Sequence, residues 1–347
     1  MSRATAYNIE PAGPFLAHSL LGRSKSTESG SDLDSTSKGE NPERGPLDVW
    51  NLKADIERGL HASADDLFHP GTVIGFSRLR GRSPNGNDDD FVGEPPRYLL
   101  TNWLHRTPAT STPENRAFII HPANLTIFSP ETLLASLLCH QPPLPRSQAI
   151  SCLDSVQLFP VFDLAAAVQA INEVSDILHS FWETRQTEDD DHRNQSEAIP
   201  HSITLIVAGL DTLTEAVIRA SNAVRGTAVL SSVLRTLTQL SRMHRSYLSV
   251  VLVNTSGVGS TVRDDAAGTP PQSQRNYDAH QSRDDGIQSM FCLTDEPLFP
   301  SLLMRTLDQG IDTHLLVSNT RRAPVVEVIK DRVGSGVGKW CTWEKNQ

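Results

Sequence analysis

Two apolar runs separated by one amphipathic segment constrain the fold of this chain more than any other feature. Residues 203–208 (ITLIVA) and 248–253 (LSVVLV) are dominated by apolar side chains, which is typical of parallel strands that are covered on both faces. Between them, apolar residues recur at steps of three and four from Val229 to Leu240, which predicts a helix with one face on the sheet. A strand–helix–strand unit predicts an open α/β sheet whose ligands bind beyond the carboxyl ends of the strands. The search for function therefore starts at residues 208–211 and at Asn254.

Further strands and helices are predicted on both sides of this unit. Helices are expected over residues 47–60, around residues 99–104, and after the capping residues Ser129 and Asp163. Additional strands are expected at residues 71–76, 117–120, 156–159, 313–317 and 325–329. The last two strands predict an antiparallel hairpin that extends the edge of the sheet. The expected fold class is therefore a mostly parallel open α/β sheet, with helices on both faces and a C-terminal antiparallel hairpin.

Composition divides the chain into a tail and a core. Residues 1–46 are rich in Ser, Gly and charged side chains, so we expect a disordered N-terminal tail. Residues 47–347 are expected to form one domain. Polar stretches at about residues 84–95, 186–200 and 257–289 predict flexible insertions within it.

Charge and cysteine content exclude several classes of protein. The chain has 31 basic and 41 acidic residues, and a net charge of −10 argues against a protein that coats nucleic acid by charge alone. Its 4 cysteines are scattered without a C-x-x-C pair, which indicates neither a zinc site nor a disulfide framework. No apolar run reaches the roughly 18 to 20 residues that span a bilayer, so no membrane partner is expected and a soluble intracellular protein is predicted.

The connection after the first strand has the position of a phosphate-binding loop, but not its standard sequence. The standard pattern is G-x-x-x-x-G-K-[ST], whereas five residues here separate Gly75 from Gly81. Arg82 stands where lysine is expected, and Ser83 keeps its place. The planar fork of arginine does not reproduce a compact ammonium group at the β- and γ-phosphates. Two interpretations stay open: a degenerate nucleotide loop and a basic surface turn.

Polar residues also follow the two central strands, where a ligand is expected. Asp211 comes three residues after Ala208 and is either a magnesium ligand or a cap or turn residue. Asn254 ends the next strand and either contacts phosphate or forms a turn. His121 has no second ligand at a characteristic spacing, so it is interpreted as a packed or capping residue. No metal site is predicted.

The order of these elements resembles that of the eukaryotic RecA-like recombinases, and in particular their recombination-mediator paralogues. The resemblance covers roughly residues 71–344. Residues 153–164 resemble the family's third strand and following helix, and residues 326–331 resemble its C-terminal hairpin. Asn254 resembles the polar residue that senses phosphate after the fifth strand. The resemblance implies a RecA-like fold of the P-loop type.

The chain departs from this family where the family does chemistry. Ala208 occupies the place of the strand-end aspartate that helps to hold magnesium, and residues 121–124 (HPAN) contain no water-activating glutamate. Arg82 replaces the lysine. Three groups are therefore altered that, in phosphoryl transfer, position the phosphates, neutralise their charge and activate the attacking water. The expectation is a chain without catalytic residues and without a firm cofactor, although ATP and Mg²⁺ stay possible ligands.

The resemblance also implies DNA contact through the segments after the fourth and fifth strands. Residues 257–289 contain acidic as well as basic side chains and only Tyr277 for base stacking, so they lack the character of an autonomous single-strand platform. The densest basic cluster lies instead at residues 78–82. The candidate contacts to DNA or to an acidic partner are Arg78, Arg80, Arg263, Arg275 and Arg283.

These observations lead to one leading hypothesis and two alternatives. The leading hypothesis is a nuclear, non-catalytic recombination and repair subunit that binds other recombinase paralogues and meets DNA as part of a complex. The first alternative is a divergent DNA-dependent ATPase of the same family. The second is a scaffold unrelated to DNA.

Overall fold

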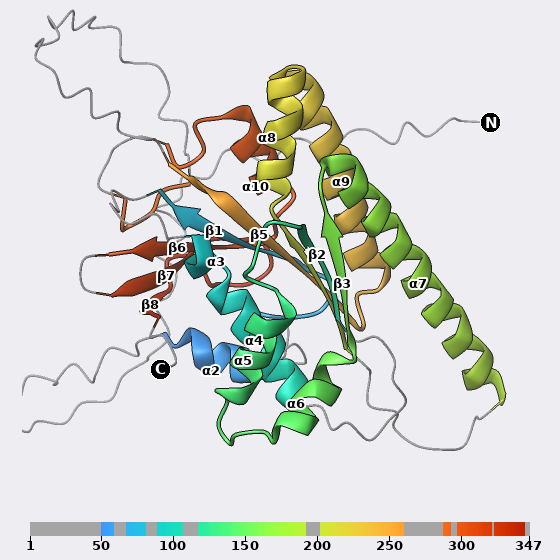
Figure 1. The fold of residues 1–347 in the computed structure, drawn as a ribbon. Helices are drawn as coiled ribbons and strands as arrows, with labels where there is room; N and C mark the ends of the chain where they lie inside the picture. The colour runs from blue at the N-terminus through green and yellow to red at the C-terminus, as the bar shows by residue number, and fades with distance from the viewer. Residues whose placement is uncertain are drawn as a thin grey trace, which may run out of the picture. The chain divides into compact units, whose positions relative to one another are not determined.

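A computed structural model (Figure 1) describes the chain over residues 50–58, 67–80, 89–106, 117–191, 202–259, 287–292, 297–320 and 323–343. All described residues belong to one compact unit, Asp48–Gln347. The predicted tail at residues 1–46 lies outside the described residues. So do the predicted site residues Gly81, Arg82, Ser83, Arg263, Arg275 and Arg283.

The described part of the chain is built on an eight-stranded sheet with the order β3-β2-β4-β5-β1-β6-β7-β8. The six strands β3, β2, β4, β5, β1 and β6 pair in parallel. Strand β7 pairs antiparallel with β6, and β8 pairs antiparallel with β7. The predicted fold class is thereby confirmed. The strands are β1 (Val73–Leu79), β2 (Ala117–Pro122), β3 (Val156–Val161), β4 (Ile203–Ala208), β5 (Leu248–Val258), β6 (Thr313–Asn319), β7 (Pro324–Asp331) and β8 (Trp340–Thr342).

Helices cover both faces of this sheet. One hydrophobic cluster joins a first face to helices α2 to α6, and a second joins the opposite face to α7 to α10 (Figure 1). The first group is α2 (Leu52–Arg58), α3 (Asp89–Val92), α4 (Glu94–Arg106), α5 (Pro130–Leu138) and α6 (Arg146–Leu153). The second is α7 (Leu164–Asp191), α8 (Leu210–Ala220), α9 (Ala223–Met243) and α10 (Leu302–Gln309).

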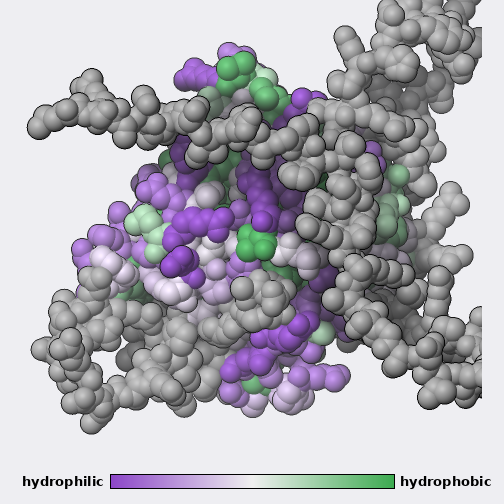
Figure 2. Space-filling view, turned by 180° about the vertical axis from the view of Figure 1, so that it is seen from behind, coloured by the Kyte–Doolittle hydropathy of each residue, from purple (hydrophilic) through white to green (hydrophobic). Residues whose placement is uncertain are grey.

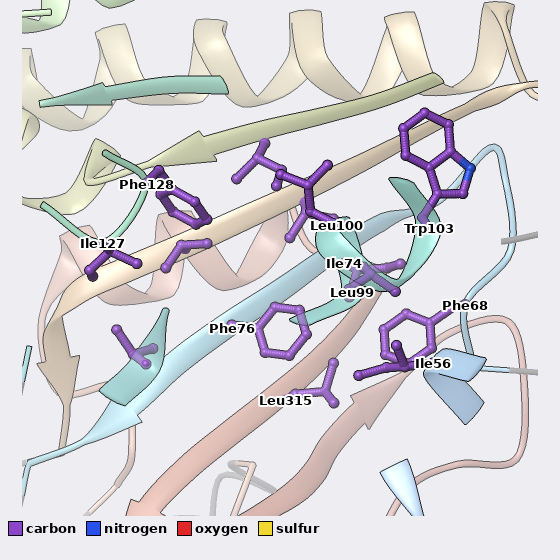
Figure 3. Close-up of a cluster of buried hydrophobic side chains, with 14 of the residues drawn as sticks. Ile56, Phe68, Ile74, Phe76, Leu99, Leu100, Trp103, Ile127, Phe128 and Leu315 are labelled. Atoms are coloured by element: carbon purple, nitrogen blue, oxygen red, sulfur yellow. The ribbon is translucent and has the colours of Figure 1, made fainter. Parts of the chain in front are cut away.

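Strand β1 shows how the sequence sorts residues between the two layers. Ile74 and Phe76 point into the first cluster, where they meet Leu99 and Leu100 of α4 and Leu315 of β6 (Figure 3). The alternate residues of β1 face the second layer, because successive side chains of a strand point to opposite faces. Both faces are therefore buried, which explains why the strand contains so few polar residues.

Local capping signals place several helix starts. The Ser129 side chain accepts a hydrogen bond from the Thr132 amide, and Pro130 follows it at the first helical position of α5. Asp163 Oδ1 accepts a bond of 2.7 Å from the amide of Ala166 at the start of α7. Both predicted caps are confirmed.

Some stretches predicted as loops are regular structure. Residues 89–95, assigned to a flexible insertion, form α3 and the start of α4, because Phe91 and Val92 are buried in the first cluster. Residues 186–191 continue α7, and residues 257–258 continue β5. The connection expected after residue 208 contains α8, and α9 begins at Ala223 rather than at Val229.

Seen from behind, the visible described residues are mostly hydrophilic or of intermediate hydropathy, with hydrophobic residues in small separate patches (Figure 2). Within the described ranges, no helix combines the length and the apolar character needed to span a membrane.

Candidate functional site at the carboxyl ends of the central strands

The sheet order brings the carboxyl ends of β4, β5 and β1 together. Ala208 of β4 pairs with Val253 of β5, and Asn254 of β5 pairs with Ser77 of β1. Asp211 follows β4 directly, in the first turn of α8. The structure therefore gathers Asp211, Asn254 and the arginines that end β1 at one edge, as expected from a parallel sheet.

Asp211 is directed at β5 and is almost completely buried, with 1% of its surface exposed. Its Oδ2 accepts hydrogen bonds from the backbone amide of Ser256 and, at 2.6 Å, from the Ser256 hydroxyl. The Thr255 hydroxyl lies 3.5 Å from Oδ1. Burial raises the pKa of Asp211 above its ordinary value, while the bonds from Ser256 oppose that rise. Asp211 thus fastens α8 to the end of β5; it lies within the first turn of α8, whose N-cap is Gly209.

Asn254 begins a chain of polar side chains that connects four strands and one helix. Its Nδ2 donates to Ser77 Oγ at 2.9 Å, and Ser77 Oγ lies 2.8 Å from His314 Nε2. The other ring nitrogen, His314 Nδ1, lies 2.9 Å from Asp308 Oδ1 of α10. Lys330 of β7 completes the chain through a bond of 2.8 Å from Nζ to Asp308 Oδ2. We call these five residues the buried polar chain.

The charge on Asp308 sets the direction of every bond in the buried polar chain. Burial alone would raise the pKa of Asp308, but the hydrogen bonds and charges of His314 and Lys330 together lower it. The ionised carboxylate accepts a hydrogen bond from His314 Nδ1–H, so the neutral ring offers Nε2 as an acceptor. Burial lowers the pKa of His314, which also favours the neutral ring. Ser77 then donates to His314 and accepts from Asn254, and all partners are satisfied.

Ser77, His314 and Asp308 have the connectivity of a serine nucleophile with its base and orienting acid. Their burial argues against that role, because Ser77 is 0% and His314 1% exposed. A nucleophile has to reach its substrate, and this hydroxyl is completely buried. Sequence reasoning missed the arrangement, although Ser77 and His314 were visible as polar residues next to apolar ones in β1 and β6.

Gly75 was predicted to open a nucleotide loop, and the structure corrects this. It lies inside β1, paired with Leu252 and His314, and the strand continues to Leu79. A Cβ at this position would come within 2.4 Å of Ile311 Cδ1. The glycine is therefore needed for the packing of Ile311, not for a close approach of backbone to phosphate.

The arginines that end β1 lie against β5 rather than in a free turn. Arg80 Nε donates to the Ser256 carbonyl at 2.9 Å, and the Arg80 amide donates to Val258. Gly257 has a φ of 77°, and a Cβ there would come within 2.8 Å of Arg80 Cγ. Arg78 is half-buried on β1, in register with Val317. Arg80 therefore has a structural contact that the interpretation as a basic surface turn did not include.

The ends of β2 and β4 offer no carboxylate to a ligand. Ala208 is 1% exposed and packs in the first hydrophobic cluster. His121 Nδ1 lies 2.9 Å from the carbonyl of Pro122, the next residue, and Ala123 and Asn124 form an exposed turn. Among the residues that the structure describes, no three His, Cys, Asp or Glu side chains are grouped as a metal site.

Tested against Mg²⁺ and a nucleotide, the described residues do not fit. Magnesium binds through carboxylates with free oxygens, and the one carboxylate at this edge is buried and accepts bonds from Ser256. Asn254 is buried, and one of its two amide N–H groups is used by Ser77. We therefore derive no chemical step through a metal or a nucleotide at these residues.

Comparisons with known proteins add little. No protein-family model and no curated protein matches the sequence. Among solved structures, the RadB recombinase matches with a TM-score of 0.42 and 12% sequence identity, over 79% of this chain and 87% of that chain. A match of this TM-score assigns neither an activity nor a ligand to the present chain.

Proposed function

We propose that this chain is a non-catalytic subunit of a DNA recombination and repair assembly, which acts by binding protein partners. The recombination context rests on the resemblance of the sequence to the RecA-like mediator paralogues. The non-catalytic character rests on one observation above all, which is the engagement of Asp211 by Ser256.

Hydrolysis of ATP requires a metal held next to the phosphates and a group that orients the attacking water. Asp211 is the only carboxylate of the described residues that directly follows β4 or β5, and its oxygens face β5 rather than open space. Releasing it for Mg²⁺ would break two hydrogen bonds and leave the Ser256 amide without its acceptor. The structure thus supports a carboxylate that stabilises the fold.

The proposal includes other recombinase paralogues as partners, a nuclear location, and DNA contact within the complex. The net charge of −10 supports weak DNA binding by the isolated chain, because phosphate contacts have to overcome the repulsion of the remaining protein.

The catalytic question is tested with purified protein, Mg²⁺, ATP and DNA. We expect hydrolysis at the background rate, unchanged in Asp211→Asn and Ser83→Ala. Magnesium-dependent turnover that both substitutions abolish, in variants that still unfold cooperatively, would favour the divergent ATPase instead.

The biological context needs a separate test. Affinity purification of the tagged chain from cells, followed by reconstitution with the recovered proteins, should yield a complex with recombinase paralogues that assembles on DNA. Recovery of partners with no link to DNA would contradict the recombination role and favour a scaffold of another kind.

A further inference from the structure

The chain separates its charges in a way that the proposed function does not explain. From Ala216 to Val262 it contains no Asp, Glu or Lys, although the whole protein has a net charge of −10. The charged side chains of this stretch are arginines alone: Arg219, Arg225, Arg235, Arg242 and Arg245. Such segregation marks a surface that favours anionic partners.

Helix α9 displays part of this stretch as a continuous outer stripe. Val224, Ala228, Arg235 and Arg242 are separated by four, seven and seven residues, so they share one side of the helix. All four are exposed. Helix α10 lies beside α9, where Gly310 packs against Leu234, and it exposes Leu302 and Arg305. We call Val224, Ala228, Arg235, Arg242, Leu302 and Arg305 the arginine face.

The acidic residues next to the arginine face are engaged elsewhere. Asp308 is bonded to His314 and Lys330. Asp312 accepts from Arg242 at 2.9 Å and from the amide of Val73 at 2.9 Å. Within the described ranges, neither Arg235 nor Arg305 forms a salt bridge. Among the described residues, these two guanidinium groups therefore have no carboxylate in salt-bridge contact to neutralise their positive charge.

The apolar members of the face indicate what kind of anion it suits. Val224 is 72% exposed and Leu302 is 52% exposed, which makes them unusual companions for a nucleic-acid backbone. The face has no aromatic side chain on which a base would stack. Arginine next to exposed apolar residues is instead the composition of protein interfaces, where the guanidinium fork binds carboxylates in a bidentate manner.

We propose that the arginine face binds an acidic segment of a partner protein, with carboxylates on Arg235 and Arg305 and apolar side chains on Val224 and Leu302. Arg242, already held by Asp312, forms the border of the contact. The stripe from Val224 to Arg242 is about 27 Å long at 1.5 Å per residue, which accommodates a partner segment of some five helical turns. This inference concerns partner chemistry and does not depend on a role in recombination.

The test places a photoreactive residue at Leu302 in the full chain in cells, and the cross-linked peptide is then sequenced by mass spectrometry. The same residue at Ile150 of α6, which is 45% exposed and belongs to the other helical layer, serves as the control position. We expect a cross-link from position 302 to a peptide of another protein that contains both carboxylates and apolar residues. Its yield should fall at least tenfold in Arg235→Glu with Arg305→Glu and stay unchanged in Arg146→Glu.

The opposite results would overturn the proposal. These are a cross-link to nucleic acid, to a second copy of this chain or to a segment without carboxylates, and a yield no higher than at position 150. A yield that the charge reversals leave unchanged would count equally against it. If the reversed pair lowers the Tm, Arg235→Gln with Arg305→Gln replaces it, with an expected fall of at least threefold. An acidic partner unrelated to DNA would support this inference and contradict the recombination role.

Discussion

Helix α10 contributes to two polar regions that use their charges in opposite ways. Its inner side carries Asp308, which joins His314 and Lys330 in the buried polar chain. Its outer side carries Arg305, an exposed member of the arginine face without a salt bridge among the described residues. Three residues of sequence separate a charge that stabilises the fold from one that is available to a partner.

The comparison shows why position at the carboxyl edge of a parallel sheet does not by itself make a ligand site. The edge holds an aspartate, an asparagine and a serine in the expected place, yet Asp211 accepts hydrogen bonds from Ser256, and Asn254 donates one to Ser77. The arginine face lies on the outer surface of two helices, and among the described residues its Arg235 and Arg305 form no salt bridge. Availability of hydrogen-bonding groups, more than their location, separates the two regions.

The strongest way to break this contrast is to remove Asp308. Asp308→Ala should lower the free energy of unfolding by about 3 kcal/mol, because it leaves the buried His314 Nδ1–H without its acceptor and the partly buried Lys330 ammonium without its counter-ion. Urea unfolding at neutral pH measures the loss. Asp308→Asn, which keeps one acceptor oxygen, should lose about half as much. Equal stability of the wild type and Asp308→Ala would mean that the buried polar chain does not stabilise the fold.

Removing Asp211 should have the next largest effect. Asp211→Ala should lower the free energy of unfolding by about 2 kcal/mol, since the buried amide and hydroxyl of Ser256 lose their acceptor. Thermal unfolding followed by circular dichroism measures the change. Thr212→Ala, an exposed neighbour in the same helical turn, is the matched control and should lose less. A stable variant with altered Mg²⁺ binding would instead restore the metal-ligand interpretation.

A pH series sharpens the contrast with a buried imidazole outside both regions. His140 stacks on Tyr98, bonds Thr101 Oγ1 at 3.0 Å, and has its pKa lowered from 6.5 to about 4, mainly by burial and then by His105. Between these values the unfolded chain binds more protons than the folded one, so stability falls as the pH drops through that window. We expect a loss of about 1.5 kcal/mol from pH 8 to pH 5 that is absent in His140→Gln. Urea titrations at both pH values measure this loss of stability. An identical dependence on pH in His140→Gln would show that His140 does not cause it.

The smallest effect on stability is expected at the arginine face. Arg235→Gln with Arg305→Gln should change the free energy of unfolding by less than about 0.5 kcal/mol, because both side chains are exposed and the bond of 3.0 Å from Arg305 Nε to the Phe299 carbonyl also lies in solvent. Urea unfolding in parallel with Asp308→Ala makes the comparison direct. A loss above about 2 kcal/mol would show that these arginines belong to the fold and are not free for a partner.

Periodicity was sufficient for most of the fold, because burial on both sides leaves a clear apolar signature. The strands at residues 203–208 and 248–253, the caps at Ser129 and Asp163, and the C-terminal hairpin follow from local pattern alone. Helix α8 did not, since its polar outer side and short length made residues 210–220 resemble a connection. Helix α3 is held by tertiary burial of Phe91 and Val92, which sequence spacing does not contain.

The site was predictable in position but not in detail. The topology of a parallel sheet placed Asp211 and Asn254 near one another, and this is observed. Their hydrogen-bond partners come from β1 and from the end of β5, and Asp308 and His314 lie far along the chain. Such long-range pairing depends on register, which a single sequence does not specify. Gly75 illustrates the same limit, because Ile311 determines its role.

The central position of β1 has a consequence for synthesis of the protein. Strand β1 lies between β5 and β6, and the Val73 amide bonds to Asp312, 239 residues further along the chain. At about 5 to 20 residues per second, translation supplies that partner roughly 10 to 50 s after β1 has been made. The other neighbour, β5, also follows only at Leu248–Val258. Strand β1 therefore lacks both of its sheet neighbours for most of this interval, while α4 is already available to cover Ile74 and Phe76 on one face.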